Sequence, residues 1–231
     1  MVAGLGVGGL LIVLPATAFA APAGAATPAV GARFQHAQKA LEAALAGRQQ
    51  RLGNLTTEVT KAADLTSSDR STLKTDLGNE TQGIDALVAK VPTDTTFKEL
   101  WADGKSMVDT YRVYLVMSPQ VHLTIAADTE TAVENKLQAA EPQIEALIQY
   151  EQSQGKNVQA AQTAYEDMVT QVSDAATDTS GVSAAVLATS PADYPANQNL
   201  FANSRSSLDQ AHKALMTARA DVKAIVKDLG I

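Results

Sequence analysis

The chain has 231 residues, a net charge of −7 and no cysteine, and only 4% of its residues are aromatic. Its length suits one domain, or one domain with an appended segment. The excess of 25 acidic over 18 basic residues, with no basic run, argues against binding to nucleic acid through the phosphates. The lack of cysteine excludes disulfides, thiolate metal sites, a cysteine nucleophile and a lipoprotein anchor.

Residues 1–20 have the pattern of a secretory signal peptide. An apolar run over residues 5–14 is followed by a proline and then by Ala18 and Ala20, the A-x-A arrangement that signal peptidase requires. The run is shorter than the roughly 20 apolar residues that span a bilayer. A buried helix or strand is the alternative, which the proline disfavours. Since no Lys or Arg precedes the run, we expect the natural start to lie upstream of Met1.

The segment after the cleavage site contains only small residues, proline and valine. Residues 21–31 therefore predict a flexible leader rich in Ala, Pro and Gly, with nothing to pack. No second long apolar segment and no hydrophobic tail or wall-sorting motif follow, so we predict no transmembrane span in the mature protein. We expect the chain to be exported, and then either released into the medium or held non-covalently at the cell envelope.

Apolar residues recur at steps of three, four and seven over most of the mature chain, the spacing of amphipathic helices of the coiled-coil type. They predict a first helix over residues 34–62 and a second over 66–91, packed antiparallel because the connection is short. Thr66 and Asp69 have capping-box spacing at the start of the second. A third helix is expected over residues 97–115.

Prolines punctuate the middle of the chain. Ser118 and Pro119 either begin a fourth helix, with Ser as its N-cap, or mark a kink in one long helix. The apolar face continues to about Tyr150, and Pro142 predicts a bend or a helix restart within it.

The last third of the chain predicts a turn at residues 153–157, a fifth helix over 158–172 and a final helix over 200–229. Residues 174–199 are rich in Ser, Thr, Ala and Pro and predict an irregular crossover with one short helix at 182–187. The expected fold is all-α, an elongated antiparallel bundle of coiled-coil-like hairpins over residues 32–231, preceded by the signal peptide. Alanine buries little area, which favours a long, thin bundle.

Residues 109–128 (DTYRVYLVMSPQVHLTIAAD) carry a family resemblance. They resemble the central D-Y-R-V-Y…P-x-x-H/R-L…A-A-D segment of a group of uncharacterised, secreted, alanine-rich helical proteins of high-GC Gram-positive bacteria. Residues 87–94 (LVAKVPTD) and 191–197 (PADYPAN) look like further landmarks of that group. The resemblance implies secretion and an all-helical fold, and it implies no activity and no functional residues.

The same central region contains a cluster of polar and aromatic candidates: Trp101, Tyr111, Arg112, Tyr114, Gln120 and His122. One interpretation is a ligand or partner pocket beside Pro119. The other is a buried polar network that fixes the register of the helices, with each hydroxyl and ring nitrogen satisfied locally.

Two pairs of carboxylates four residues apart, Glu130 with Glu134 and Glu141 with Glu145, each lie on one helical face and predict solvated surfaces. No Glu has a His three residues later, and no two histidines have His-x-x-x-His spacing, so neither a di-iron nor a zinc helix is indicated. Ser71 to Lys74 has Ser-x-x-Lys spacing, but the other elements of the penicillin-interacting enzymes are lacking. We therefore expect no cofactor, no metal and no catalytic set.

These observations favour an exported, non-enzymatic helical protein with a structural or partner-binding role at the cell envelope or in the medium. Its partner is expected to be another protein or an envelope component. Self-association through exposed heptad faces is a further expectation. The alternative is a sensor or enzyme that binds a small ligand or a metal through Tyr111, Arg112, Tyr114, Gln120 and His122.

Overall fold

The computed structural model of the chain describes residues 27–194 and 197–231, and these residues form helices and connecting turns without a strand. The elements are α1 (Thr27–Lys61), α2 (Ser67–Lys90), η2 (Val91–Thr93), α3 (Phe97–Asp109), η3 (Val113–Met117), α4 (Ser118–Ser153), α5 (Gln159–Thr179), α6 (Val182–Leu187), η4 (Pro191–Asp193) and α7 (Ala202–Leu229). The expected all-α fold is confirmed. The signal segment, with Ala18 and Ala20, lies outside the described residues.

The elements differ from the expected boundaries in four of the long helices. Helix α3 ends at Asp109 and the π-helix η3 follows at Val113, in place of one helix over residues 97–115. Helix α1 begins at Thr27, inside the segment expected to be a flexible leader. Helix α5 continues to Thr179, inside the expected crossover, because Ala175 and Thr179 are buried and extend its inward face. Helix α4 continues past Pro142 without a restart. The expectation of Ser118 as N-cap is wrong, because Met117 holds that position with helical backbone and α4 continues directly from η3, with Pro119 in its first turn.

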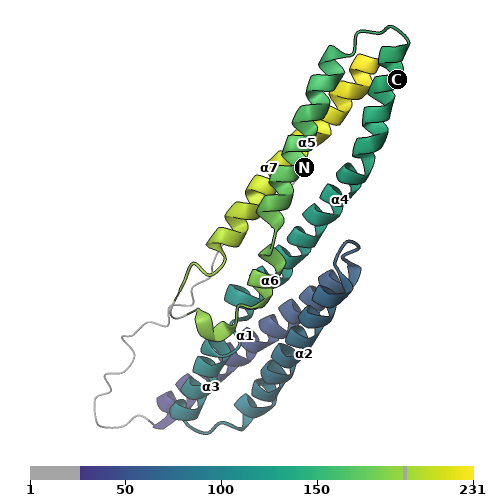
Figure 1. Cartoon of the computed structure of the whole chain (residues 1–231). Coiled ribbons are helices and arrows are strands. Elements are labelled where there is room, and N and C mark those ends of the chain that lie inside the picture. Colours follow the sequence, from purple (N-terminus) through teal and green to yellow (C-terminus); the bar gives the residue numbers. More distant parts are fainter. Residues whose placement is uncertain (1–26, 195–196) are drawn as a thin grey trace.

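The first three long helices and the start of α4 form one packing group. Helices α1 and α2 run antiparallel, and α3 lies against α1, with Leu41 of α1 next to Gly104 (Figure 1). Their apolar faces share one core, to which the largest contributions come from Leu45, Leu52, Leu55, Val59, Leu73, Leu77, Ile84, Leu87, Leu100 and Met107. Burying these leucine and valine side chains is the main stabilising term for this group, at about 1.5–3 kcal/mol each.

Arg70 closes the turn between α1 and α2. Its guanidinium donates to the main-chain carbonyls of Val59, Thr60, Ala62 and Leu65, with the bond to Thr60 at 3.1 Å. Carbonyls at the C-terminus of a helix have no partner within the helix, so one charged side chain satisfies the end of α1. The tight hairpin follows from this contact.

The second packing group consists of α5, α7 and most of α4. Helices α5 and α7 run antiparallel in close contact (Figure 1), and small side chains line their interface. The buried alanines are Ala161, Ala175, Ala211, Ala214 and Ala218. Alanine lets the two helix backbones approach closely, but each alanine buries little apolar area. The contact is therefore stabilised through its length.

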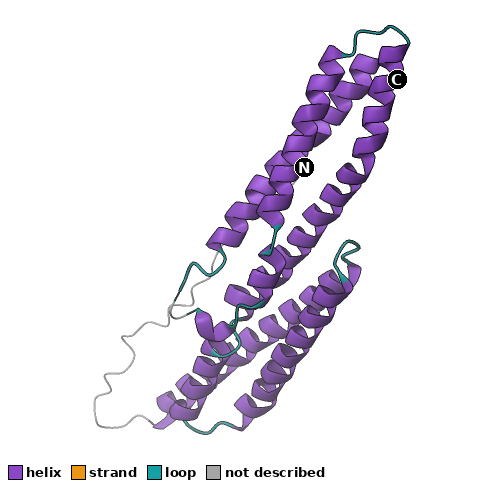
Figure 2. Ribbon diagram, in the orientation of Figure 1, coloured by secondary structure: helices purple, strands orange, loops and turns teal. Residues whose placement is uncertain are grey.

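Helix α4 packs in both groups, and α6 lies where the two groups meet. Val182 and Val186 of α6 pack with Val116, Ala127 and residues at the start of α7. The molecule is therefore elongated, and α4 runs through both sets of helices as one continuous helix, as Figure 2 shows. Among the described residues, none of the helices combines the length and the hydropathy that a membrane span requires.

Tyr111 packs its ring directly on the backbone of α2. A Cβ built on Gly83 would lie 2.0 Å from Cε1 of Tyr111, well inside contact distance, whereas one built on Gly78 of the same helix meets no atom within 4 Å. The absence of a side chain at Gly83 is therefore what lets α2 and the segment after α3 meet.

We expect Gly83→Ala to lower the free energy of unfolding by about 1–3 kcal/mol, because the methyl group must displace the Tyr111 ring. The matched variant Gly78→Ala should raise it by about 0.5–1 kcal/mol, since alanine is the better helix former. Urea denaturation of both proteins measures the difference. Equal effects at the two glycines would contradict the described contact.

Glu80 of α2 predicts a pH dependence of stability. Burial, with a smaller contribution from Asp76, raises the pKa of Glu80 to about 7, and no residue in the described part of the chain donates a hydrogen bond to its Oε2. The folded state therefore binds a proton more tightly than the unfolded state, so this contribution to stability is complete below the ordinary pKa of 4.5 and is lost as pH rises to about 7. We expect Glu80→Gln to be more stable than the parent at pH 8 and equally stable at pH 4.5 in urea titrations. If the free energies of unfolding of the parent and Glu80→Gln differed by the same amount at every pH, the assignment of this pH dependence to Glu80 would be refuted.

Candidate functional site

The segment between α3 and α4 has an unusual backbone at the position where the sequence cluster is centred. Arg112 has φ 33° and ψ 40°, the left-handed region, and the π-helix η3 follows it directly. A residue other than glycine in this region costs about 1–2 kcal/mol. Surrounding contacts must therefore hold Arg112 in place.

The side chain of Arg112 supplies such contacts. It is only 8% exposed, its Nη2 lies 3.3 Å from Oδ1 of Asp109, and its guanidinium stacks over the Tyr194 ring at 4.8 Å from the centroid. Its Nε is buried and has no hydrogen-bond acceptor among residues 27–194 and 197–231. Arg112 thus ties the end of α3 to the segment after η4 through one ion pair and one cation–π contact.

Gln120 lies on α4 and faces α6. It is almost fully buried, and its Nε2 donates to the carbonyls of Val186 at 3.1 Å and Thr189 at 2.6 Å. Val186 lies in the last turn of α6, where its carbonyl also accepts from the main-chain N–H of Thr189 at 3.2 Å, and Thr189 lies just after the helix. One amide group therefore caps α6 and fixes it on α4.

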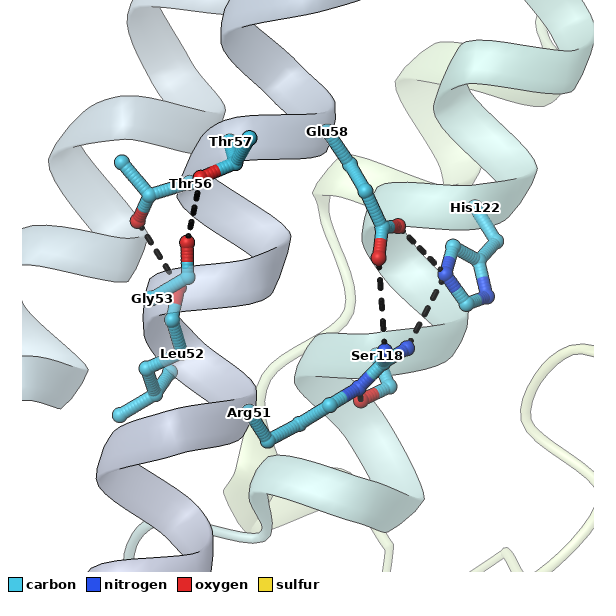
Figure 3. Close-up of polar contacts among 8 residues, drawn as sticks. All are labelled: Arg51, Leu52, Gly53, Thr56, Thr57, Glu58, Ser118 and His122. Atoms are coloured by element: carbon cyan, nitrogen blue, oxygen red, sulfur yellow. Dashed lines mark hydrogen bonds and ion pairs between the residues drawn. The ribbon is translucent and has the colours of Figure 1, made fainter.

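His122 lies two residues further along, on the side of α4 that faces α1. Figure 3 shows it with Arg51, Glu58 and Ser118. Its Nε2 is 2.8 Å from Oε2 of Glu58 and 3.0 Å from Nη2 of Arg51, while Nε of Arg51 donates to Oγ of Ser118 at 3.0 Å. This group links the middle of α1 to the first turn of α4.

The tautomer of His122 decides which of its two contacts is a hydrogen bond. A protonated Nε2 donates to Glu58, and an unprotonated Nε2 accepts from Arg51, but one nitrogen cannot do both. The ring is about half exposed. The arrangement is that of a polar contact between helices at the rim of the packed core.

The three aromatic candidates lie in different surroundings. Tyr111 packs against Gly83 in the first core, and Tyr114 is half exposed with Arg48 stacked on its ring at 5.2 Å. Trp101 lies on the outer face of α3 and is 66% exposed.

The structure thus distributes the six sequence candidates over separate neighbourhoods. Arg112 faces Tyr194, Gln120 faces α6, His122 faces α1, Tyr111 and Tyr114 pack on different helices, and Trp101 faces solvent. His122 lines a surface depression of about 420 Å³ together with residues of α1. Each of the buried candidates makes local contacts that join helices.

The expectation of solvated carboxylates on α4 is wrong for Glu130 and Glu134. Glu134 is buried and its Oε1 accepts from Thr179 at 2.9 Å, while Oε1 of Glu130 lies 2.8 Å from Nδ1 of His212. The sequence carried a signal for this. Gln120, Thr124, Ala127 and Glu134 follow one another at steps of four, three and seven, and all four are buried, so Glu134 lies on the inner face of α4.

Comparisons of the chain with protein-family models, with curated proteins and with solved structures found no match. In the described part of the chain, no group of three or more His, Cys, Asp or Glu side chains is arranged to hold a metal ion.

We expect Gln120→Ala to destabilise the protein by about 1–3 kcal/mol, because it removes a buried side chain and the donor to the Thr189 carbonyl, while the Val186 carbonyl keeps the N–H of Thr189. His122→Ala should cost less than about 1 kcal/mol, since its ring is half exposed and its polar contacts with Glu58 and Arg51 are largely solvated. The two residues are neighbours on α4, so each serves as the control for the other in thermal and urea unfolding. A larger loss for His122→Ala would contradict this assignment.

Proposed function

We propose that this chain is an exported, non-enzymatic helical protein that binds another protein of the cell envelope or the surrounding medium. The signal-like pattern of residues 1–20 supports export. The contacts of Arg112, Gln120 and His122, which join helices, support a scaffold more than a reaction centre.

The outer face of α3 is the observation that carries the binding role. Phe97, Trp101 and Val108 follow one another at steps of four and seven, which puts them on one side of the helix, and all three are exposed. Leu100 and Met107 lie about a quarter of a turn away around the helix and are buried. Trp101 is the only tryptophan of the chain. Exposed aromatic side chains of this kind are typical anchors of protein interfaces.

A small-ligand or metal site built from Tyr111, Arg112, Tyr114, Gln120 and His122 has less support, because these side chains face different neighbours. Self-association is the stronger alternative to binding of a different protein. A second copy could cover the same face of α3, so the experiment must separate the two.

We expect a benzophenone-bearing amino acid in place of Trp101 to give a covalent adduct with a different protein when the producing cells are irradiated. The matched control replaces Met216, which is also exposed but lies on α7. Mass spectrometry identifies the adduct and the mature N-terminus, expected directly after Ala20. An adduct with a second copy would show self-association, and equal adducts at both positions would refute a specific face. An uncut chain inside the cells would contradict export.

A further inference from the structure

Helix α3, which carries the exposed face around Trp101, is attached to the protein by few side chains. Of its 13 residues, the buried ones are Leu100, Asp103 and Met107. They follow one another at steps of three and four and form the inner face of the helix. One of the three is a carboxylate, which is costly to bury unless its oxygens find partners. The contacts of Asp103 therefore bear directly on how firmly α3 is held.

Asp103 has one oxygen that is paired and one that is not. The residue is 4% exposed, and its Oδ1 forms an ion pair with Nζ of Lys90 at the end of α2. Its Oδ2 is buried, and no described residue donates a hydrogen bond to it. The ion pair thus accounts for one oxygen of Asp103 and leaves the other without a donor.

Asp94 has the same feature and lies on the segment between α2 and α3. It follows η2 and is 7% exposed, and its Oδ2 is also buried with no donor among residues 27–194 and 197–231. Its side chain and that of Asp103 lie within hydrogen-bonding reach of each other. Two ionised carboxylates repel each other, whereas one shared proton makes one group a donor and the other an acceptor. A single proton would therefore satisfy this buried pair.

Few charged groups act on Asp94. Burial is the largest cause that raises the pKa of Asp94, and the charge of Asp103 is the next. Lys90 lowers this pKa, while Glu99, which caps the start of α3, adds to the rise. From α1, which packs on η2, Gln38 contacts this segment, and its uncharged amide donates to a main-chain carbonyl at 2.8 Å. In the described part of the chain, Lys90 is thus the one positive charge that acts on Asp94.

The direction of the pH effect follows from the raised pKa of Asp94. A carboxyl group whose pKa is higher in the folded than in the unfolded state binds its proton more tightly after folding. Its contribution to stability is complete below the ordinary pKa of 3.8 and is lost as pH rises through the raised pKa. Above that pH the pair has lost its shared proton, and the inner face of α3 is held mainly by Leu100 and Met107.

We propose that Asp94 and Asp103 share one proton in acidic surroundings, that this contact holds α3 on the segment after α2, and that its loss at higher pH loosens the helix. The contact regulates the binding face around Trp101, which is presented on a firmly held helix at low pH and on a loosened one at high pH. This regulatory role rests on the proposed function, whereas the contact itself does not.

Hydrogen exchange into the folded full-length chain, measured on peptides of α3 and corrected for the intrinsic effect of pH, tests the contact. Protection of α3 should fall by about two- to tenfold between pH 4.5 and pH 8, the equivalent of one hydrogen bond. Asp94→Asn should keep the acid level of protection at pH 8, because its amide donates to Asp103 without titrating. Asp94→Ala should show low protection at both pH values.

Asp109→Asn is the matched control. Asp109 lies on the same helix, and its hydrogen bond with Lys105 lowers its pKa, so it stays ionised over the same range of pH. This variant should keep the pH dependence of the parent, and peptides of α7 should show no comparable change. A parent-like pH dependence in Asp94→Asn, or an equal loss of protection in α3 and α7, would overturn the contact.

A second measurement separates the contact from its regulatory role. The benzophenone adduct at position 101 should form in higher yield when cells are irradiated at pH 4.5 than at pH 8, and in equal yields at both pH values when Asp94→Asn is added. A yield in the parent that does not change with pH would refute the regulation. The absence of an adduct with a different protein at either pH would refute the proposed function together with the regulation, while hydrogen exchange would still decide the contact.

Discussion

The length of α4 is the constraint on which the rest of the structure depends. This helix of 36 residues packs with α1 at its start, where its Val121 enters the core that α1, α2 and α3 share, and with α5, α6 and α7 along the remainder. The two packing groups have separate apolar cores, so neither could position the other without a rigid element that enters both. A break within α4 would leave two small helical units, each with limited buried area.

Polar contacts along α4 set how the helical groups are arranged around it. Ser118 and His122 meet α1, Gln120 meets α6, Asp128 meets the start of α2, and Glu134 meets the end of α5. Apolar packing alone is weakly directional, whereas a buried polar group tolerates few alternative arrangements. Carboxylates kept in this interface also cost stability, because burial disfavours their charged form and raises the pKa of Asp128 and Glu134.

The helices and the first hairpin could be predicted from the sequence, because apolar spacing and the Thr66 to Asp69 cap are local signals. Other features needed the tertiary structure. Glu134 is buried because α5 ends beside it, and the left-handed backbone at Arg112 depends on contacts with Asp109 and Tyr194. Neighbours in sequence suggested one cluster around Pro119, but adjacent residues on a helix point in different directions, so its members face different helices.

The most direct test of this account is a distance between the two helical groups. The chain contains no cysteine, so spin labels can be attached at Thr75→Cys on α2 and Gln152→Cys near the end of α4, both exposed positions. Pulsed electron–electron double resonance then reports the distribution of distances between the two spin labels. Because α4 enters both groups as one helix, we predict a single narrow population. A broad or two-peaked distribution would show that the groups move independently and would contradict the account.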